Sequence, residues 1–183
     1  MSHQLSARPE PTEYAPYYDR YISRVVDGNI ITTLEEQIDK TVAFLNGVSD
    51  AQSMFRYAPD KWSLKEVVGH LIDSERVFGY RVLRFARNDQ TPLSGFEQND
   101  YVREAAFDEQ SLSDLALEFE HVRRANLHLL RGLNEKAWDR RGEANGNPVS
   151  VRALAYIIAG HELHHMEIIR TKYLRRDWDR RVR

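Results

Sequence analysis

Cysteine is absent from this chain of 183 residues. Its absence excludes disulfides, cysteine-ligated zinc and a cysteine nucleophile, so any thiol chemistry needs a thiol that arrives as a substrate. An excess of positive charge is missing too, because the formal net charge is −2, and we expect no nucleic-acid partner. Residues 177–183 are an exception, an Arg-rich tail that we interpret as a solvent-exposed helix end.

Long apolar runs are also missing. The N-terminus has no apolar core of the kind that a signal peptide needs, and no segment reaches the length of a membrane span. We therefore expect a cytoplasmic protein without a membrane partner. The composition, 42% hydrophobic and 30% charged, is typical of one globular domain. Pro9, Pro11 and Pro16 indicate an irregular lead-in over residues 1–29, ahead of a domain over residues 30–176.

Apolar residues recur at helical spacing in four segments, at about residues 33–47, 63–87, 111–133 and 149–176. No segment alternates in the way that a half-buried strand does. The connection between the second and third segments is long for a bundle, and long ordered connections often have a function. Four amphipathic helices with one long crossover predict an all-α protein, a four-helix bundle.

Local signals mark where three of these helices begin. Thr33 and Ser63 each stand three residues before a glutamate, which is the pattern of a capping box. Pro148 is well placed to begin the last helix, because proline is favoured at the first helical position.

The last predicted helix contains the stretch HELHH, from His161 to His165. On a helical wheel His161 and His165 lie in the middle of the apolar stripe, whereas His164 lies at its edge. Two imidazoles that face a core are costly unless each finds a partner. A divalent metal ion would satisfy both, provided that a third ligand comes from elsewhere. Core histidines bonded to carbonyls or carboxylates are the alternative.

The second predicted helix carries two further polar candidates. His70 lies about 100° from the centre of its apolar stripe, so periodicity places it at a seam between helices rather than deep in the core. Glu75 lies among the apolar residues, where a lone carboxylate should be paired or linked to a metal. A structural network with Tyr, Arg or Trp is the alternative for Glu75.

Two metalloenzyme classes can be rejected. HELHH matches the H-E-x-x-H pattern of zinc peptidases, but their extended motif needs Gly and His where this chain has Ile168 and Thr171. The chain also has no upstream strand to hold an extended peptide. A carboxylate-bridged di-iron bundle needs two Glu-x-x-His motifs that face the core from separate helices. Glu162 begins one, but the motif that ends at His121 lies on the face of its helix opposite the apolar stripe.

Three stretches resemble the DinB/YfiT-like superfamily of four-helix bundles. They are KWSLKEVVGHLIDSERVFGYR, TPLSGFEQNDYV and NGNPVSVRALAYIIAGHELHHMEIIR, and together they cover most of Leu34 to Leu174. The resemblance implies one divalent metal ion, usually nickel or zinc, held by His70, His161 and His165. It also implies a homodimer and a small-molecule substrate, because characterised relatives include transferases of low-molecular-weight thiols of the bacillithiol and mycothiol type.

We therefore expect a divalent-metal-dependent enzyme, a thiol transferase or a hydrolase, in which the metal activates a thiol or a water. Glu75, and after it Glu162, could accept the proton. Candidate substrate contacts are Asn99 and Tyr101 in the long connection and Arg123 and Asn126 on the third helix, with loop capping and pairing to Glu75 as alternative roles. The competing hypothesis is a non-catalytic metal- or ligand-binding bundle of a stress response.

Overall fold

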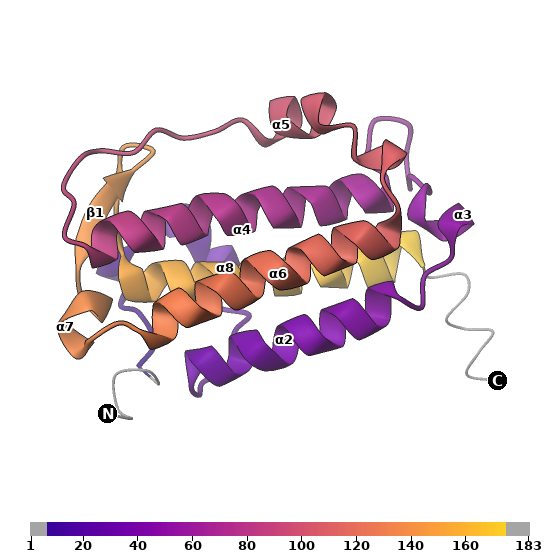
Figure 1. Ribbon diagram of the computed structural model, residues 1–183. Helices are drawn as coiled ribbons and strands as arrows, with labels where there is room; N and C mark the ends of the chain where they lie inside the picture. Colours follow the sequence, from indigo (N-terminus) through magenta and orange to yellow (C-terminus); the bar gives the residue numbers. More distant parts are fainter. Residues whose placement is uncertain (1–6, 175–183) are drawn as a thin grey trace.

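The computed structural model describes residues 7–174, so the Arg-rich tail and the predicted helix end at Arg176 lie outside the described residues. Four long helices form a bundle (Figure 1), which confirms the predicted fold class. They are α2 (Ile30–Leu45), α4 (Leu64–Ala86), α6 (Leu112–Arg131) and α8 (Val151–Ile168). A π-helical turn, η5 (Ile169–Tyr173), continues α8, and a short helix, α3 (Asp50–Ser53), lies between α2 and α4.

The first two long helices, α2 and α4, are not packed side by side in this bundle, whereas α4 and α6 are. Each of α2 and α4 packs against both α6 and α8, so α2 and α4 lie diagonally across from each other. Figure 1 shows that α4 and α6 end at the same end of the bundle and therefore run in the same direction. Two parallel helices need a connection that returns along the bundle, and the segment between them does so. It contains α5 (Gln98–Ala105) and η4 (Phe107–Glu109).

Of the three helix starts that local signals marked, one was right and two were wrong. Ser63 caps α4 through a capping box with Glu66, as expected. Thr33 does not begin α2, because Asn29 accepts hydrogen bonds from two amides one turn earlier and the helix begins there. Pro148 does not begin α8 either, since Ser150 caps that helix and Pro148 lies in a strand.

A short hairpin precedes α8, and the expectation that the chain has no strand was wrong. A helical turn, α7 (Glu135–Trp138), leads into β1 (Arg141–Ala144), which pairs antiparallel with β2 (Asn147–Ser150). Asn145 and Gly146 have φ angles of 52° and 71°, the left-handed values that a two-residue hairpin turn of type I′ requires. The amide of Leu93 donates to the Glu143 carbonyl at 2.9 Å, which ties the long connection to the hairpin.

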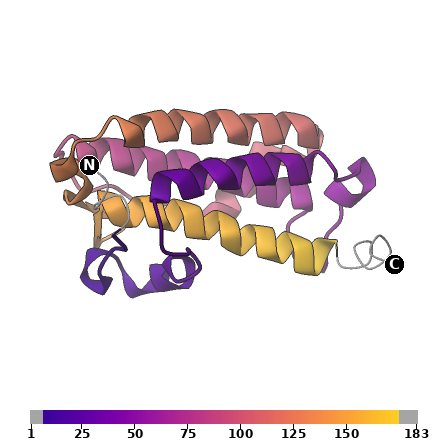
Figure 2. The same ribbon diagram turned by 90° about the horizontal axis from the view of Figure 1, so that it is seen from below.

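The lead-in, expected to be irregular, contains three short helical turns. They are η2 (Pro11–Glu13), η3 (Pro16–Tyr18) and α1 (Asp19–Ile22). Figure 2 shows this segment lying against α8 on the outside of the bundle, and α1 packs on α8. Gly160 permits the approach, because a Cβ atom there would collide with the carbonyl oxygen of Tyr21.

A buried polar layer divides the core into two apolar clusters. The cluster at the hairpin end includes Phe78 of α4 and Leu127 of α6. The cluster at the other end includes Ile72 of α4 and Phe119 of α6. Between them, each long helix places polar side chains that are buried. These are Gln37 and Thr41 on α2, Glu75 on α4, Arg123 on α6, and His161 and Glu162 on α8.

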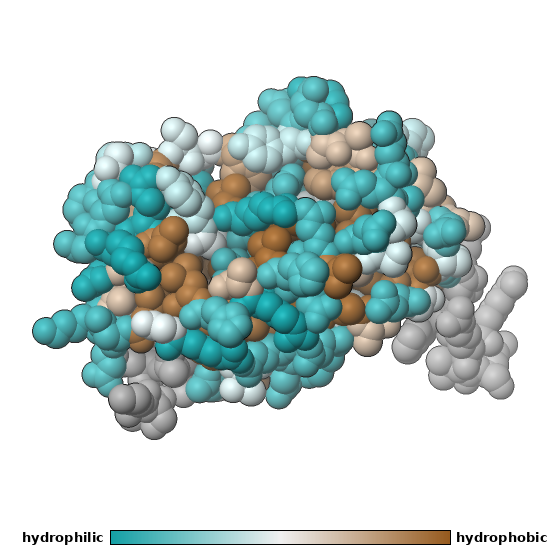
Figure 3. All heavy atoms as spheres, viewed as in Figure 1, coloured by the Kyte–Doolittle hydropathy of each residue, from teal (hydrophilic) through white to brown (hydrophobic). Residues whose placement is uncertain are grey.

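The surface has the character that the composition indicated. Hydrophilic side chains cover most of the face seen in Figure 3, and the apolar atoms form separate patches. Within residues 7–174, no helix combines the length and the apolar character that a membrane crossing needs.

Candidate metal centre

Three imidazoles meet at one side of the polar layer. His70 comes from α4, and His161 and His165 come from successive turns of α8. A ring nitrogen from each lies within 4.8 Å of the others, and Nε2 of His70 lies 3.1 Å from Nε2 of His161. The structure thus brings together the three histidines that the resemblance implied. His164 does not belong to this group, although its ring centroid lies 5.1 Å from that of His165.

His70 is buried more deeply than the helical wheel indicated. His70 is only 2% exposed, although it lies away from the apolar stripe of α4. The reason is that α4 contacts α6, α8, α5 and η4, so neighbours cover a wider arc than the stripe. Gly69 and Ser74 on this arc are buried as well, and neither adds to a hydrophobic pattern. The seam location was correct, but the shallow burial was wrong.

Burial keeps the three imidazoles neutral at pH 7. It lowers the pKa of His70 from 6.5 to about 4. It also lowers the pKa of His161 and His165 well below 6.5, and the neighbouring histidines lower them further. A neutral imidazole keeps a lone pair for a metal ion. Two buried histidines and one half-buried histidine, all neutral and with converging nitrogen atoms, are a set that fits a divalent ion such as zinc or nickel.

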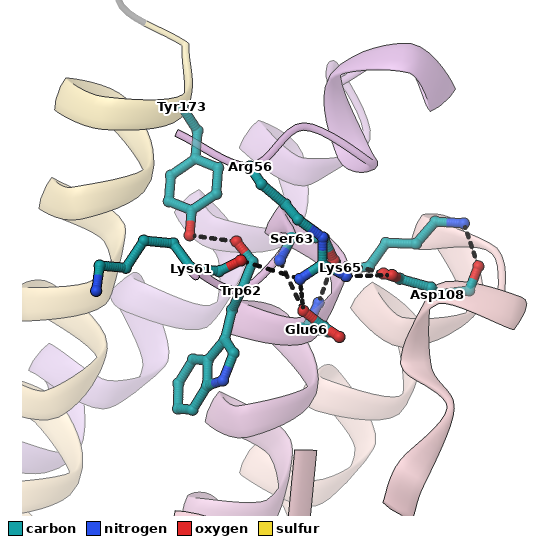
Figure 4. Close-up of polar contacts among 8 residues, drawn as sticks. All are labelled: Arg56, Lys61, Trp62, Ser63, Lys65, Glu66, Asp108 and Tyr173. Carbon is teal, nitrogen blue, oxygen red and sulfur yellow. Dashed lines mark hydrogen bonds and ion pairs between the residues drawn. The ribbon is translucent and has the colours of Figure 1, made fainter. Parts of the chain in front are cut away.

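Aromatic rings enclose these histidines. The ring of Trp62 lies 4.9 Å from that of His70, and the ring of Tyr21 lies 5.2 Å from that of His161. Tyr173 of η5 donates a hydrogen bond to the Trp62 carbonyl at 2.8 Å. Figure 4 shows the Trp62 indole pointing away from the polar contacts around its backbone. The end of α8 therefore helps to fix the ring that packs on a candidate ligand.

A salt-bridge network surrounds the residues next to Trp62 (Figure 4). Arg56 pairs with both Glu66 and Asp108, at 2.5 and 2.7 Å. Ser63 donates a hydrogen bond to Asp108, so the start of α4 is tied to η4. These contacts fix the start of α4 and the residue that precedes it.

The predicted carboxylates form a second group, which is centred on Arg123. Its Nε and Nη2 atoms donate to Glu75 at 2.8 and 3.0 Å, and its Nη1 atom lies 2.8 Å from Oε2 of Glu162. Asn126 also donates to Glu75, at 3.0 Å, and Thr41 donates to Glu162 at 2.6 Å. The contact between Arg123 and Oε2 of Glu162 is a close ion pair but does not have the geometry of a hydrogen bond. No described residue donates a hydrogen bond to this oxygen atom. This arrangement is the structural network that was the alternative for Glu75.

Charge is not balanced in this second group. Burial lowers the pKa of Arg123, but the two carboxylates outweigh that effect and the pKa is raised. One guanidinium thus faces two carboxylates, with side-chain exposure of 1%, 3% and 2% for Arg123, Glu75 and Glu162. Neither carboxylate belongs to the histidine group.

The two candidates in the long connection lie away from the histidines. Asn99 is exposed, and its amide donates to Glu97 at the start of α5. Tyr101 is 47% exposed, and its ring lies 5.1 Å from that of Phe96. Neither residue lines the cavity beside the histidines. The capping residue of α5 is therefore Glu97, and Asn99 donates to it.

A cavity of about 290 Å³ opens beside His70 and His161. The lead-in forms part of its wall, the hairpin turn and the long connection form another part, and α4 contributes a third. The lining includes Tyr17, Tyr18 and Tyr21, Ser74, Phe78 and Arg81, residues 95–98, and Asn145 and Asn147.

Most of these lining residues were not predicted from the sequence, although two signals for them were present. His70, Ser74 and Arg81 are spaced at i, i+4 and i+11, which places them on one helical face. The dipeptide at Asn145 and Gly146 is the strongest short signal for a hairpin turn. The lead-in tyrosines carried no such signal, because their position depends on the packing of α1 against α8.

Comparison with known proteins agrees with this fold. The family model described as the DinB superfamily matches residues 33–169. Among solved structures, YfiT from Bacillus subtilis, described as "a probable metal-dependent hydrolase with an unusual four-helix bundle topology", is 18% identical, with a TM-score of 0.69. The match covers 95% of this chain and 98% of YfiT.

A second solved structure is also similar. YjoA from Bacillus subtilis, described as a DinB-like protein, is 20% identical, with a TM-score of 0.59. The match covers 81% of this chain and 91% of YjoA. No curated protein sequence matches the chain. Both structural likenesses concern the fold alone.

Proposed function

The chain belongs to the DinB superfamily, and we propose that it is a divalent-metal-dependent enzyme that acts on a small molecule, as a thiol transferase or a hydrolase. One observation carries the proposal. His70, His161 and His165 offer nitrogen atoms within 4.8 Å of one another; His70 and His161 are buried and line a cavity, and His165 is half-buried. The cavity volume, about 290 Å³, is near the lower limit for small-molecule sites and fits a metabolite better than a polymer.

In this proposal the three histidines hold one divalent ion, which we expect to be nickel or zinc. When bound by neutral imidazoles with a position left open, such an ion lowers the pKa of a coordinated water or thiol and so supplies a nucleophile at neutral pH. Trp62 and Tyr21 pack on the ligand rings and hold them in place. The aromatic walls also limit the access of bulk water, which strengthens electrostatic interactions in the site.

Glu75 and Glu162 enter the proposal as positioning residues rather than as proton acceptors. Arg123 already engages both carboxylates, and neither belongs to the histidine group. Arg123 and Asn126 likewise act on Glu75 rather than on a substrate. The excess of negative charge that these residues bury supports the binding of a cation in the same layer.

Metal analysis of the purified protein tests the site. We expect about one nickel or zinc ion per chain in the wild type and almost none in the double variant His161→Ala/His165→Ala. Saturation at 100 times Kd should stabilise the wild type by about 2.7 kcal/mol, and the variant should not respond. His121→Ala/His128→Ala is the matched control, because both residues are exposed. A wild type that stays metal-free after incubation with both ions would contradict the proposal.

The pairing of both buried carboxylates favours a second candidate, a non-catalytic metal- or ligand-binding bundle. An enzyme of this kind needs a group that accepts a proton. Glu75 and Glu162 were the predicted proton acceptors, and both are paired with Arg123. A panel of low-molecular-weight thiols with electrophiles, and of hydrolysable esters and amides, separates the two. Turnover that depends on the metal supports the enzyme, whereas a metal-loaded protein that is inert toward every member supports the binding protein.

A further inference from the structure

Arg81 is a buried cation that has no carboxylate partner. It is 4% exposed, yet no Asp or Glu within residues 7–174 forms an ion pair with it. Its Nη2 atom donates to the Ser94 carbonyl at 3.3 Å, and its guanidinium carbon lies 5.7 Å from the centroid of the Phe78 ring. A guanidinium has five N–H donors, and within residues 7–174 only the Ser94 carbonyl accepts a hydrogen bond from this one. Among the described residues, the other arginine buried to this degree is Arg123, and it faces two carboxylates instead.

An unpaired buried charge is costly, and chains seldom retain one without a partner. The location of Arg81 indicates where such a partner would come from. Arg81 lines the same cavity as His70 and His161. His70, Ser74 and Arg81 lie on one face of α4, with roughly 16 Å of helix between the first and the last Cα atom. The cavity thus has candidate metal ligands toward one part of this face and a cation toward another.

The remaining lining does not neutralise Arg81. Asn145 and Asn147 of the hairpin are uncharged, and they contribute amide groups to the wall. Glu97 is the carboxylate among the lining residues, but it is exposed and caps the start of α5 by accepting from Asn99. The position of Asn145 is fixed by close packing, because a Cβ atom at Gly95 would collide with its side chain.

We propose that Arg81 binds the anionic end of the molecule on which the histidine site acts. This inference rests on the proposed function and adds the substrate class: a small molecule with a carboxylate or a phosphate at one end. A guanidinium fork suits either group, because it donates two parallel hydrogen bonds to paired oxygens. The reacting end of the molecule then lies toward His70 and His161.

Titration calorimetry with simple anions tests this assignment on the full-length protein. Succinate and succinamide form the carboxylate arm, and glycerol 3-phosphate and glycerol form the phosphate arm. We expect one of the two anions to bind while its neutral analogue does not, and that arm identifies the charged group. Arg81→Met should weaken the binding tenfold or more. Arg81→Lys, which retains the charge and loses the fork, should lie between Arg81→Met and the wild type.

Arg84→Met is the matched control, because Arg84 lies on the same helix and pairs with Asp89 and Tyr80 instead. It should bind the anion as the wild type does. Equal binding by Arg81→Met and the wild type would overturn the assignment, and so would the failure of both anions to bind. Each protein is measured both metal-loaded and metal-stripped. Arg81-dependent binding to the stripped protein supports the anion site even where metal analysis contradicts the proposed function.

The melting temperature gives a second, independent readout. If Arg81 is retained to bind a ligand, Arg81→Met should be as stable as the wild type or more stable, because the substitution removes an unpaired buried charge. A melting temperature for Arg81→Met at or above that of the wild type therefore supports the proposal. A large fall, or a failure to fold, would show that Arg81 is needed for the structure and would contradict it.

Discussion

Arg123 holds two carboxylates that are almost fully shielded from water. Its side chain and those of Glu75 and Glu162 are each exposed by 3% or less. Each partner comes from a different long helix, so one guanidinium joins α4, α6 and α8. Buried ion pairs of this kind add little net stability compared with apolar residues of the same shape, but removing one member is expensive because a charge is left without a partner.

Arg123→Met should therefore destabilise the protein by about 3–5 kcal/mol at pH 7, because two buried carboxylates lose their cation. Urea denaturation measures the change. Arg124→Met is the matched control, since the neighbouring Arg124 side chain is 49% exposed and its loss should cost roughly 0.5 kcal/mol or less. Equal losses in the two variants would show that the network contributes nothing beyond an ordinary surface pair.

Single residues differed in how far the sequence could place them. The helical wheel placed His161 and His165 toward the core because both lie on the same face of the helix as Leu154 and Ile158. His70 could not be placed in the same way, because the arc of α4 that is buried against α8, α5 and η4 carries small and polar side chains. His70 was predicted as a candidate metal ligand only because the chain resembles a known family. Arg81 was missed because a charged residue is expected to be exposed unless its partner is known.

At the scale of elements, α8 depends on a glycine in its interior. Glycine in a helix usually costs about 1 kcal/mol relative to alanine, so Gly160 is unfavourable for α8 taken alone. It is needed because the backbone of Tyr21 crosses α8 at this point. The close approach brings the Tyr21 ring against His161, at 5.2 Å between centroids.

Gly160→Ala should reduce stability by about 1–3 kcal/mol, the usual range for overpacking, despite the better helix propensity of alanine. Hydrogen exchange should also become faster in α1 and not in α6, because α1 has to move away. Gly132→Ala is the control, since a Cβ atom there meets only ordinary contacts at 3.5 Å. If Gly160→Ala were as stable as the wild type, the contact with Tyr21 would not be a tight one.

Periodicity found the four long helices but not the elements that shape the cavity. The helices are long. In α2, α4 and α6 a buried apolar stripe repeats several times, and α8 is apolar over most of its surface. The strands of the hairpin span four residues each, and β2 contains Pro148, so neither shows alternation. α1 also spans only four residues. Short elements of this kind are stabilised mainly by tertiary contacts, which a local pattern does not contain.

At the scale of the whole molecule, Glu13 ties the lead-in to the rest of the fold. It is 1% exposed, and Ser150 and Arg152 donate to its two oxygens at 2.6 and 2.7 Å. Burial alone would raise the pKa of Glu13, but the hydrogen bonds from Arg152 and Ser150 outweigh it and the pKa is lowered from 4.5. The interaction therefore stabilises the protein above pH 4.5 and is lost as the pH falls through the lower pKa of the folded state.

Glu13→Gln should accordingly be less stable than the wild type at pH 7, and the difference should shrink as the pH is lowered below about 4.5. Denaturation curves at pH 7, 5, 4 and 3 measure both proteins. Glu143→Gln is the control, because Glu143 is exposed and lies in the hairpin that contains Ser150. Its stability should equal that of the wild type at each pH. A difference between Glu13→Gln and the wild type that stayed constant from pH 7 to pH 3 would mean that the charge of Glu13 is irrelevant to folding.

The tyrosines that line the cavity and the three candidate ligand histidines come from separate stretches of the chain. The family match begins at residue 33 and contains His70, His161 and His165, whereas Tyr17, Tyr18 and Tyr21 precede it. Tyr21 packs on His161, but Tyr17 and Tyr18 stack on other aromatic rings, so a substitution at either of these two can reshape the cavity wall while the imidazoles stay in place. The shape of the cavity and the chemistry within it can therefore diverge separately, and exchanging Tyr17 and Tyr18 for the residues of relatives is a direct way to alter one while keeping the other.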